Sequence, residues 1–105
     1  LNPEPFVVLP SPVQNNYYEW DTSIIKDIVI SNATPVQLDI INLVSGSRLI
    51  AHVYGNALDE AYLANQDFIL TKPYSYIDME DPNTQMYIYT FSYDGVKKLM
   101  TRQVV

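Results

Sequence analysis

Apolar side chains recur at every second position along most of this sequence, and this alternation limits the folds that the chain can adopt. The alternating segments are short and are separated by turn-forming residues. Side chains of a β-strand point alternately to opposite faces, so a period of two predicts strands with one buried face. In residues 26–31, Ile28 and Ile30 should face one way while Asp27 and Ser31 face the other.

Two of these segments, 36–44 and 48–54, predict a central hairpin joined at Ser45-Gly46-Ser47. Glycine at the first position of a two-residue loop favours a type II′ turn. In that register Ile40 faces Val53, on an apolar face that is broken only by Asn42. Because the opposite face is also largely apolar, we expect a second layer to cover part of it.

Residues 85–92 and 96–104 predict a second hairpin, because Asp94-Gly95 between alternating segments is a strong turn signal. A two-residue loop would place Tyr89 opposite Met100 and Phe91 opposite Lys98. The basic residues of this last segment are typical of a solvated edge strand protected by lysines, and an anionic contact is the alternative. These basic residues are Lys97, Lys98 and Arg102.

One short helix is predicted between residues 57 and 64, with Asn56 as its N-cap. About seven short strands and so little helix predict an all-β fold. We expect a two-sheet antiparallel β-sandwich, immunoglobulin-like in its architecture. The chain has no cysteine, so the cysteine pair of true immunoglobulin domains is absent.

The first dozen residues differ from the rest because prolines bracket an apolar run within them. Proline removes a backbone donor and keeps the preceding residue extended. We therefore predict an extended arm over residues 1–12 and a single domain over residues 13–105. The arm either packs on its own domain as a first strand or docks on a neighbour. Its candidate partner-binding residues are Phe6, Val7, Val8 and Leu9.

Composition argues against several classes of function. A net charge of −6 disfavours nucleic acid as a partner, since a phosphate backbone needs a basic face. The only histidine, His52, lies inside a predicted strand, and no serine has the surroundings of a nucleophile. No apolar stretch is long enough to span a membrane. We expect no catalytic residues, no cofactor and no metal, and we expect the acidic turn at 78–83 to be solvated rather than a calcium site.

Aromatic residues are numerous, with nine tyrosines and one tryptophan, and three of them cluster at Tyr17, Tyr18 and Trp20. Neighbouring side chains of a strand cannot all point into one core, so at least one of the three should be near the surface. Such rings could stack on sugars, which makes carbohydrate binding the alternative function. The simpler interpretation buries Trp20 and places the tyrosines at the edges of the sheets.

The favoured function is therefore a non-enzymatic structural subunit. It would be a virion coat or decoration protein, a surface filament or an accessory module of a larger protein. Its partner would be a protein, either a second copy or another subunit, met through the arm and the sheet edges. The chain begins at Leu1 rather than Met, so we expect it to derive from a longer product, with an extracellular or virion location.

Overall fold

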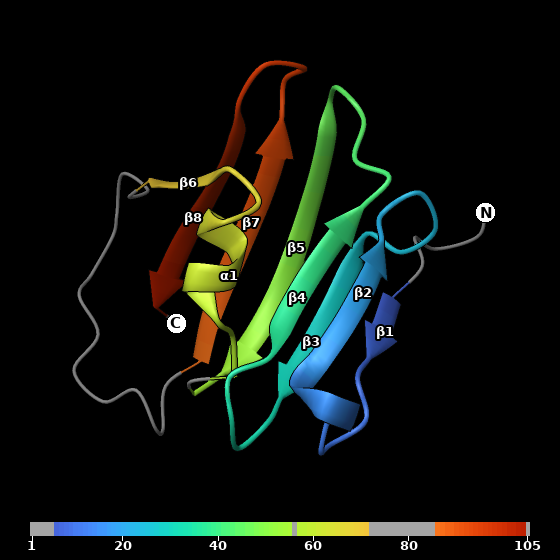
Figure 1. Ribbon diagram of the computed structural model, residues 1–105, viewed down its shortest axis with the longest axis vertical. Coiled ribbons are helices and arrows are strands. Elements are labelled where there is room, and N and C mark those ends of the chain that lie inside the picture. Colours follow the sequence, from blue (N-terminus) through green and yellow to red (C-terminus); the bar gives the residue numbers. More distant parts are fainter. Residues whose placement is uncertain (1–5, 56, 72–85, 105) are drawn as a thin grey trace.

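A computed structural model describes residues 6–55, 57–71 and 86–104, and at Phe6 the backbone alone. These residues are mostly β-strand, with one short α-helix and a 3-10 turn at Gln14–Asn16 (Figure 1). The strands are β1 (Phe6–Val8), β2 (Tyr17–Asp21), β3 (Asp27–Ser31), β4 (Gln37–Ile41), β5 (Ser47–Tyr54), β6 (Phe68–Thr71), β7 (Met86–Tyr93) and β8 (Lys98–Val104). The helix α1 is Glu60–Ala64 and lies between β5 and β6 in the chain.

The strands form two sheets. The larger sheet has six strands in the order β1-β3-β5-β7-β8-β6, and the smaller one contains β2 and β4. β2, β4 and α1 lie on the same side of the larger sheet (Figure 1). The prediction of a mostly β protein is confirmed, but the antiparallel, immunoglobulin-like sandwich is not. Pairing is parallel between β1 and β3, β3 and β5, β2 and β4, and β6 and β8, and antiparallel only from β5 through β7 to β8.

The predicted hairpin between 36–44 and 48–54 is wrong, because its two strands belong to different sheets. A tight turn does form, one residue earlier than predicted: Gly46 has φ +90° at its third position, and the Ser47 N–H donates to the Val44 carbonyl at 2.9 Å. Before that turn, however, Asn42 adopts φ +60°, which redirects the chain after β4. β4 then pairs with β2, whereas β5 pairs with β3 and β7.

The hairpin of β7 and β8 is confirmed, with a register two residues away from the predicted one. Phe91 lies opposite Met100, where Lys98 was expected, and Tyr89 lies opposite Arg102. The cause is a four-residue loop, 94–97, in place of a two-residue turn. The Asp94 carboxylate accepts from the N–H groups of Val96 and Lys97 at 2.8 and 2.7 Å, which stabilises the longer loop. A shift by two leaves each side chain on its predicted face.

The helix is shorter than predicted and has a different cap. Asp59 is the N-cap, and its side chain accepts from the Tyr62 N–H at 3.1 Å. Asn56, the predicted cap, is outside the described residues. Leu63 is the buried residue of α1, whereas Ala61 is exposed.

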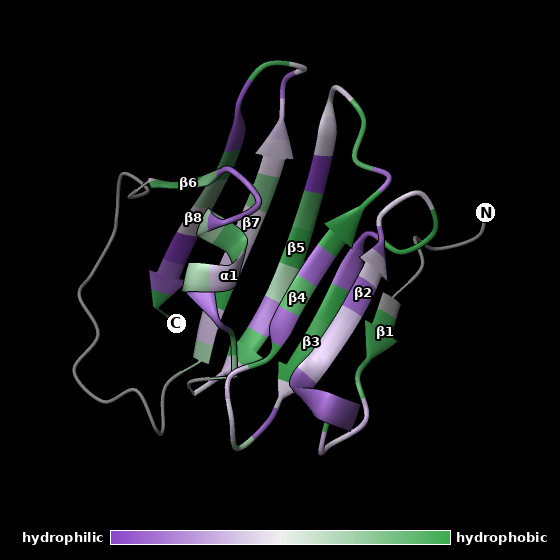
Figure 2. Ribbon diagram, in the orientation of Figure 1, coloured by the Kyte–Doolittle hydropathy of each residue, from purple (hydrophilic) through white to green (hydrophobic). Residues whose placement is uncertain are grey.

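The core fills the space between the larger sheet and the layer formed by β2, β4 and α1. Trp20 from β2 has no exposed surface, and its ring meets Phe91 of β7 edge to face at 5.8 Å. The predicted burial of Ile28 and Ile30 on one face of β3 is confirmed. Apolar bands alternate with polar ones along β4 and β5 (Figure 2). Both sheets therefore turn one face of each strand toward a common interior.

The prediction that the lysines of the last segment guard an edge strand is also wrong. β6 pairs with β8 on its outer side, so β8 is an interior strand. Lys98 instead donates to the Gln66 carbonyl at 3.2 Å and lies 5.7 Å from the centre of the Phe68 ring. Arg102 donates to Glu60 of α1 at 2.7 Å. Both cations thus fasten the helical segment to the sheet.

Candidate functional site

The proposed arm contributes an edge strand to its own sheet. β1 runs parallel to β3, and the Leu9 N–H donates to the Val29 carbonyl at 2.9 Å. Leu9 is 4% exposed and belongs to the core, and Val7 packs against that core. Val8 points the other way and is 62% exposed. Of the candidate partner-binding residues with a described side chain, Val8 is therefore the one available to another molecule, and the contact with a neighbour stays a prediction.

Val8 lies on a face of the larger sheet that no described element covers, which we call the open face. Residues of this face are in register across the sheet, since Val8 is beside Val29, which is beside His52 of β5 and then Ile88 of β7. Exposed apolar side chains of this face lie on β1, β5 and β6. They are Val8 (62% exposed), Ile50 (39%), Tyr54 (47%) and Ile69 (49%).

The open face carries little net charge for a chain with a net charge of −6. At its centre the His52 Nε2 lies 3.6 Å from the Asp27 Oδ1, and each side chain is about one third exposed, at 30% and 29%. The same Oδ1 is buried and accepts no hydrogen bond from the described residues. Apart from this pair, the cation that the face carries on β5 is Arg48, two residues before Ile50. The centre of the face is therefore suited to contact with another protein surface.

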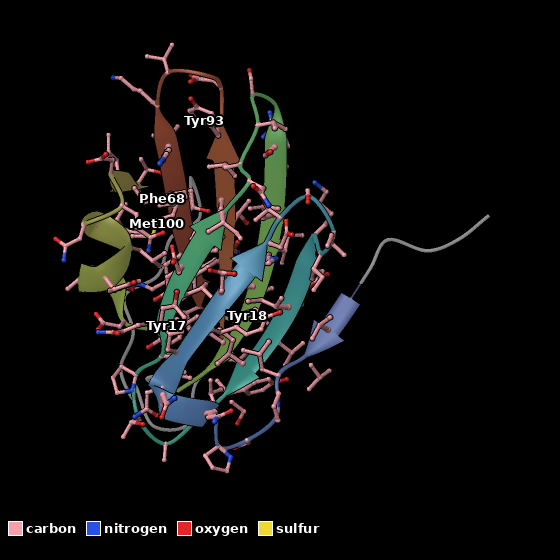
Figure 3. All side chains as sticks on the ribbon, turned by 45° about the vertical axis from the view of Figure 1, so that its right-hand side comes forward. Tyr17, Tyr18, Phe68, Tyr93 and Met100 are labelled. Carbon is pink, nitrogen blue, oxygen red and sulfur yellow. The ribbon has the colours of Figure 1, made fainter. Side chains whose placement is uncertain are left out.

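The aromatic cluster is divided between the core and the surface. Trp20 is fully buried, and its indole N–H donates to the Ile25 carbonyl at 2.7 Å, so it offers no ring face to a sugar. Tyr18 is half-buried and packs against the core. Tyr17 is exposed, and its hydroxyl donates to Asp39 at 2.8 Å (Figure 3). This hydrogen bond to a carboxylate raises the pKa of Tyr17 to about 12.

A polar network joins the helix to the inner face of the larger sheet. The Tyr89 hydroxyl and the Arg102 guanidinium both donate to the Glu60 Oε2. Burial, and then the hydrogen bond to Glu60, raise the pKa of Tyr89 well above its usual value. Tyr89 is buried whereas Glu60 and Arg102 are partly exposed, and the hydrogen bonds among them account for the network as a structural one.

The open face was only partly visible in the sequence. The second apolar face of residues 48–54 was recognised, but it was assigned to a covering layer. Ile69 was missed as a surface residue, because a single exposed apolar residue carries no distinguishing pattern. The open face could have been predicted from the strands whose alternation places apolar side chains on both faces.

Within the described ranges, no three or more His, Cys, Asp or Glu side chains gather in a way that could hold a metal ion. The acidic turn at 78–83, considered for calcium, lies outside those ranges. No described helix has the length and apolar character needed to cross a membrane.

Comparison with known proteins gives no relative for this arrangement. No family model matches the chain, and neither a curated protein nor a solved structure matches it.

Proposed function

We propose that this chain is a non-enzymatic structural subunit that assembles with further copies of itself through the open face of its larger sheet. The observation that carries the proposal is the exposure of Val8, Ile50, Tyr54 and Ile69 on one uncovered face. Uncovered apolar surface on a folded domain is typical of interaction sites.

The dimensions of the open face suit a contact between two copies. Six strands spaced by about 4.8 Å give a width of about 29 Å. With a usable strand length of about 20 Å, each copy would cover roughly 600 Å², or about 1,200 Å² in total. Specific interfaces begin near this size, so we expect a weak dimer in which two sheets pack face to face.

The centre of the face also favours burial. The side chains of Asp27 and His52 lie close to one another, so His52 is placed to become a donor to the carboxylate when a second copy covers the pair. Ile50 and Tyr54 lie four residues apart on β5, so their side chains share one face and supply an aliphatic and an aromatic contact. Tyrosine is favoured at interfaces because it buries a large area while its hydroxyl can stay hydrated.

Sedimentation velocity over micromolar to millimolar concentrations tests the proposal. The wild-type chain should pass from monomer to dimer, and the double substitution Ile50→Lys/Tyr54→Lys should keep it monomeric. Ala61→Lys, at an exposed position of α1 on the other side of the sheet, is the matched control and should dimerise like the wild type. Urea unfolding should show that all three chains fold. A wild-type chain that stays monomeric, or a double variant that dimerises normally, contradicts the proposal.

A further inference from the structure

Three of the cations in the described ranges lie at one end of the molecule. Lys98 and Arg102 are fastened to the helical segment, as described above. Lys26, Arg48 and Lys97 lie instead at the connections β2–β3, β4–β5 and β7–β8, where Lys26 donates to the Thr22 carbonyl at 2.6 Å. We call residues 22–26, 42–48 and 94–97 the loop end. In a chain with a net charge of −6, this local excess of positive charge is distinctive.

Two adjoining hollows expose these cations. One, of about 320 Å³, is lined by Arg48 and Lys97 together with Tyr93, which is labelled in Figure 3. The other, of about 350 Å³, is lined by Arg48 and Lys26. A backbone hydrogen bond of 2.7 Å from Gly46 to Tyr93 holds the two connections together. Arg48 therefore stands between two hollows whose walls are fixed relative to each other.

Carboxylates near the loop end are already engaged with uncharged donors. Asp94 accepts from two backbone amides, and Asp21 accepts from Ser23 and Asn42. Among the described residues, Arg48 has no ion-pair or hydrogen-bond partner. An anionic group from outside the molecule could therefore enter these hollows without displacing an internal ion pair.

The three connections also carry exposed aliphatic side chains at their tips. These are Ile24, Val44 and Val96, of which Val96 is 85% exposed. A small hydrated anion would gain no binding energy from these aliphatic side chains. Cations surrounded by aliphatic tips suit a carboxylate-bearing protein surface that also offers apolar contact.

The smaller sheet presents such a surface. Glu19 of β2 and Asp39 of β4 are register partners on the outer side of that sheet, and we call the pair the acidic strip. Neither carboxylate has a cation within 4.0 Å among the described residues. Like charges side by side on neighbouring strands destabilise a sheet. Tyr17, exposed beside them, donates its hydroxyl to Asp39 and adds an aromatic contact.

We propose that the loop end of one copy binds the acidic strip of a second copy, with Arg48 and Lys97 meeting Glu19 and Asp39. This inference rests on the proposed self-assembly and adds a second interface to it. The two surfaces differ, so the contact is heterologous and can continue from copy to copy.

The two interfaces can be tested separately. All measurements use an Ile50→Ser/Tyr54→Ser background, which removes apolar contacts from the open face without adding charge beside Arg48, so a failure here does not depend on the face-to-face contact. The loop variant carries Arg48→Glu/Lys97→Glu, and the strip variant carries Glu19→Lys/Asp39→Asn. Arg48→Lys/Lys97→Arg keeps the charges and is the matched control. The substituted side chains, except the half-buried Asp39, are exposed, so the variants should fold.

The background protein and the charge-keeping control should self-associate in sedimentation velocity at low salt. Their apparent affinity should weaken at least tenfold when ionic strength rises from about 0.05 to about 0.5 M, since exposed charges are screened. The loop and strip variants should each be monomeric alone and should form a 1:1 complex when mixed, because one intact pair of surfaces remains. A mixture that stays monomeric, association that ignores salt, or a loop variant that still self-associates overturns the inference. So does binding of inorganic phosphate, or of vesicles containing anionic lipid, more tightly than a second copy.

Discussion

Replacing Leu9 by alanine should lower the free energy of unfolding by about 2–3 kcal/mol. Leu9 is 4% exposed and sits in the core next to a strand held by a single neighbour. Truncating a buried leucine to alanine costs about 2–5 kcal/mol, from lost burial and from the cavity that remains. We expect the lower part of this range because an edge strand can relax toward the cavity. With a urea dependence of about 1–3 kcal/mol/M, the midpoint should fall by roughly 0.7–3 M.

The neighbouring Val8 supplies the matched control. It is 62% exposed on the open face, so Val8→Ala should change the stability of the monomer by less than about 0.5 kcal/mol. Trp20, the only tryptophan, is fully buried and reports unfolding by its fluorescence. At micromolar concentration the chain should be monomeric, so self-association does not affect the unfolding free energies that are compared. If the two substitutions have equal and small effects, β1 does not pack on its own domain, and the arm would be available as a whole to a partner.

Substitutions at three further residues test local contacts. Asp59→Ala should destabilise the chain by about 1 kcal/mol in urea unfolding, since the cap of α1 is lost, and Asp59→Asn should retain most of the stability. Asp94→Ala should lower the melting temperature. The backbone amides of Lys97 and Val96 hold the pKa of Asp94 below its usual value, so protonation of Asp94 destabilises the wild-type chain below about pH 4. The variant should therefore lose less stability than the wild type in that pH range. An unchanged acid profile would contradict this role. The raised pKa of Tyr89 means that its contribution is present below about pH 10 and is lost as pH rises further. Tyr89→Phe should remove up to about 1.4 kcal/mol per pH unit from that alkaline slope, and an identical slope in both proteins would refute the assignment.

The features predicted correctly from sequence depend on residues close together in the chain. Burial of Ile28 and Ile30 follows from the period of β3 alone, and the hairpin of β7 and β8 follows from its turn. Its register could not be predicted, because Asp94 supports both a two-residue and a four-residue loop, and only the side-chain hydrogen bonds decide between them.

The larger errors concern which strands pair. The turn at Gly46 is compatible with a hairpin and also with a connection between sheets, because the alternation of the flanking residues is the same in both. Asn42 was the available signal, since it interrupts the apolar face and tolerates a left-handed backbone, which it adopts with φ +60°. Parallel pairing leaves no local signal, because the partners are about twenty residues or more apart.

The candidate surfaces were predictable only in part. The sequence identified Val8 and Tyr17 as candidates, but their neighbours on each surface come from distant strands. Glu19 and Asp39 become adjacent only through the pairing of β2 with β4. Arg48 and Lys97 line one hollow because β5 pairs with β7 and the loop after β7 folds back.

The winding of the chain between the two sheets bears on how this protein reaches its native state. β1 to β5 alternate between the sheets, so β1 and β2 each gain a first partner only when the next strand but one has formed. The hairpin of β7 and β8 is the pairing whose strands follow each other directly. The entropy of closing long loops is lost before the contacts between distant strands stabilise the chain, and this slows folding toward the range of milliseconds to seconds. During synthesis β5 emerges before β7, so its second edge stays unpaired until the C-terminal hairpin is complete. This interval, rather than the native state, is when the chain is most exposed to misassociation.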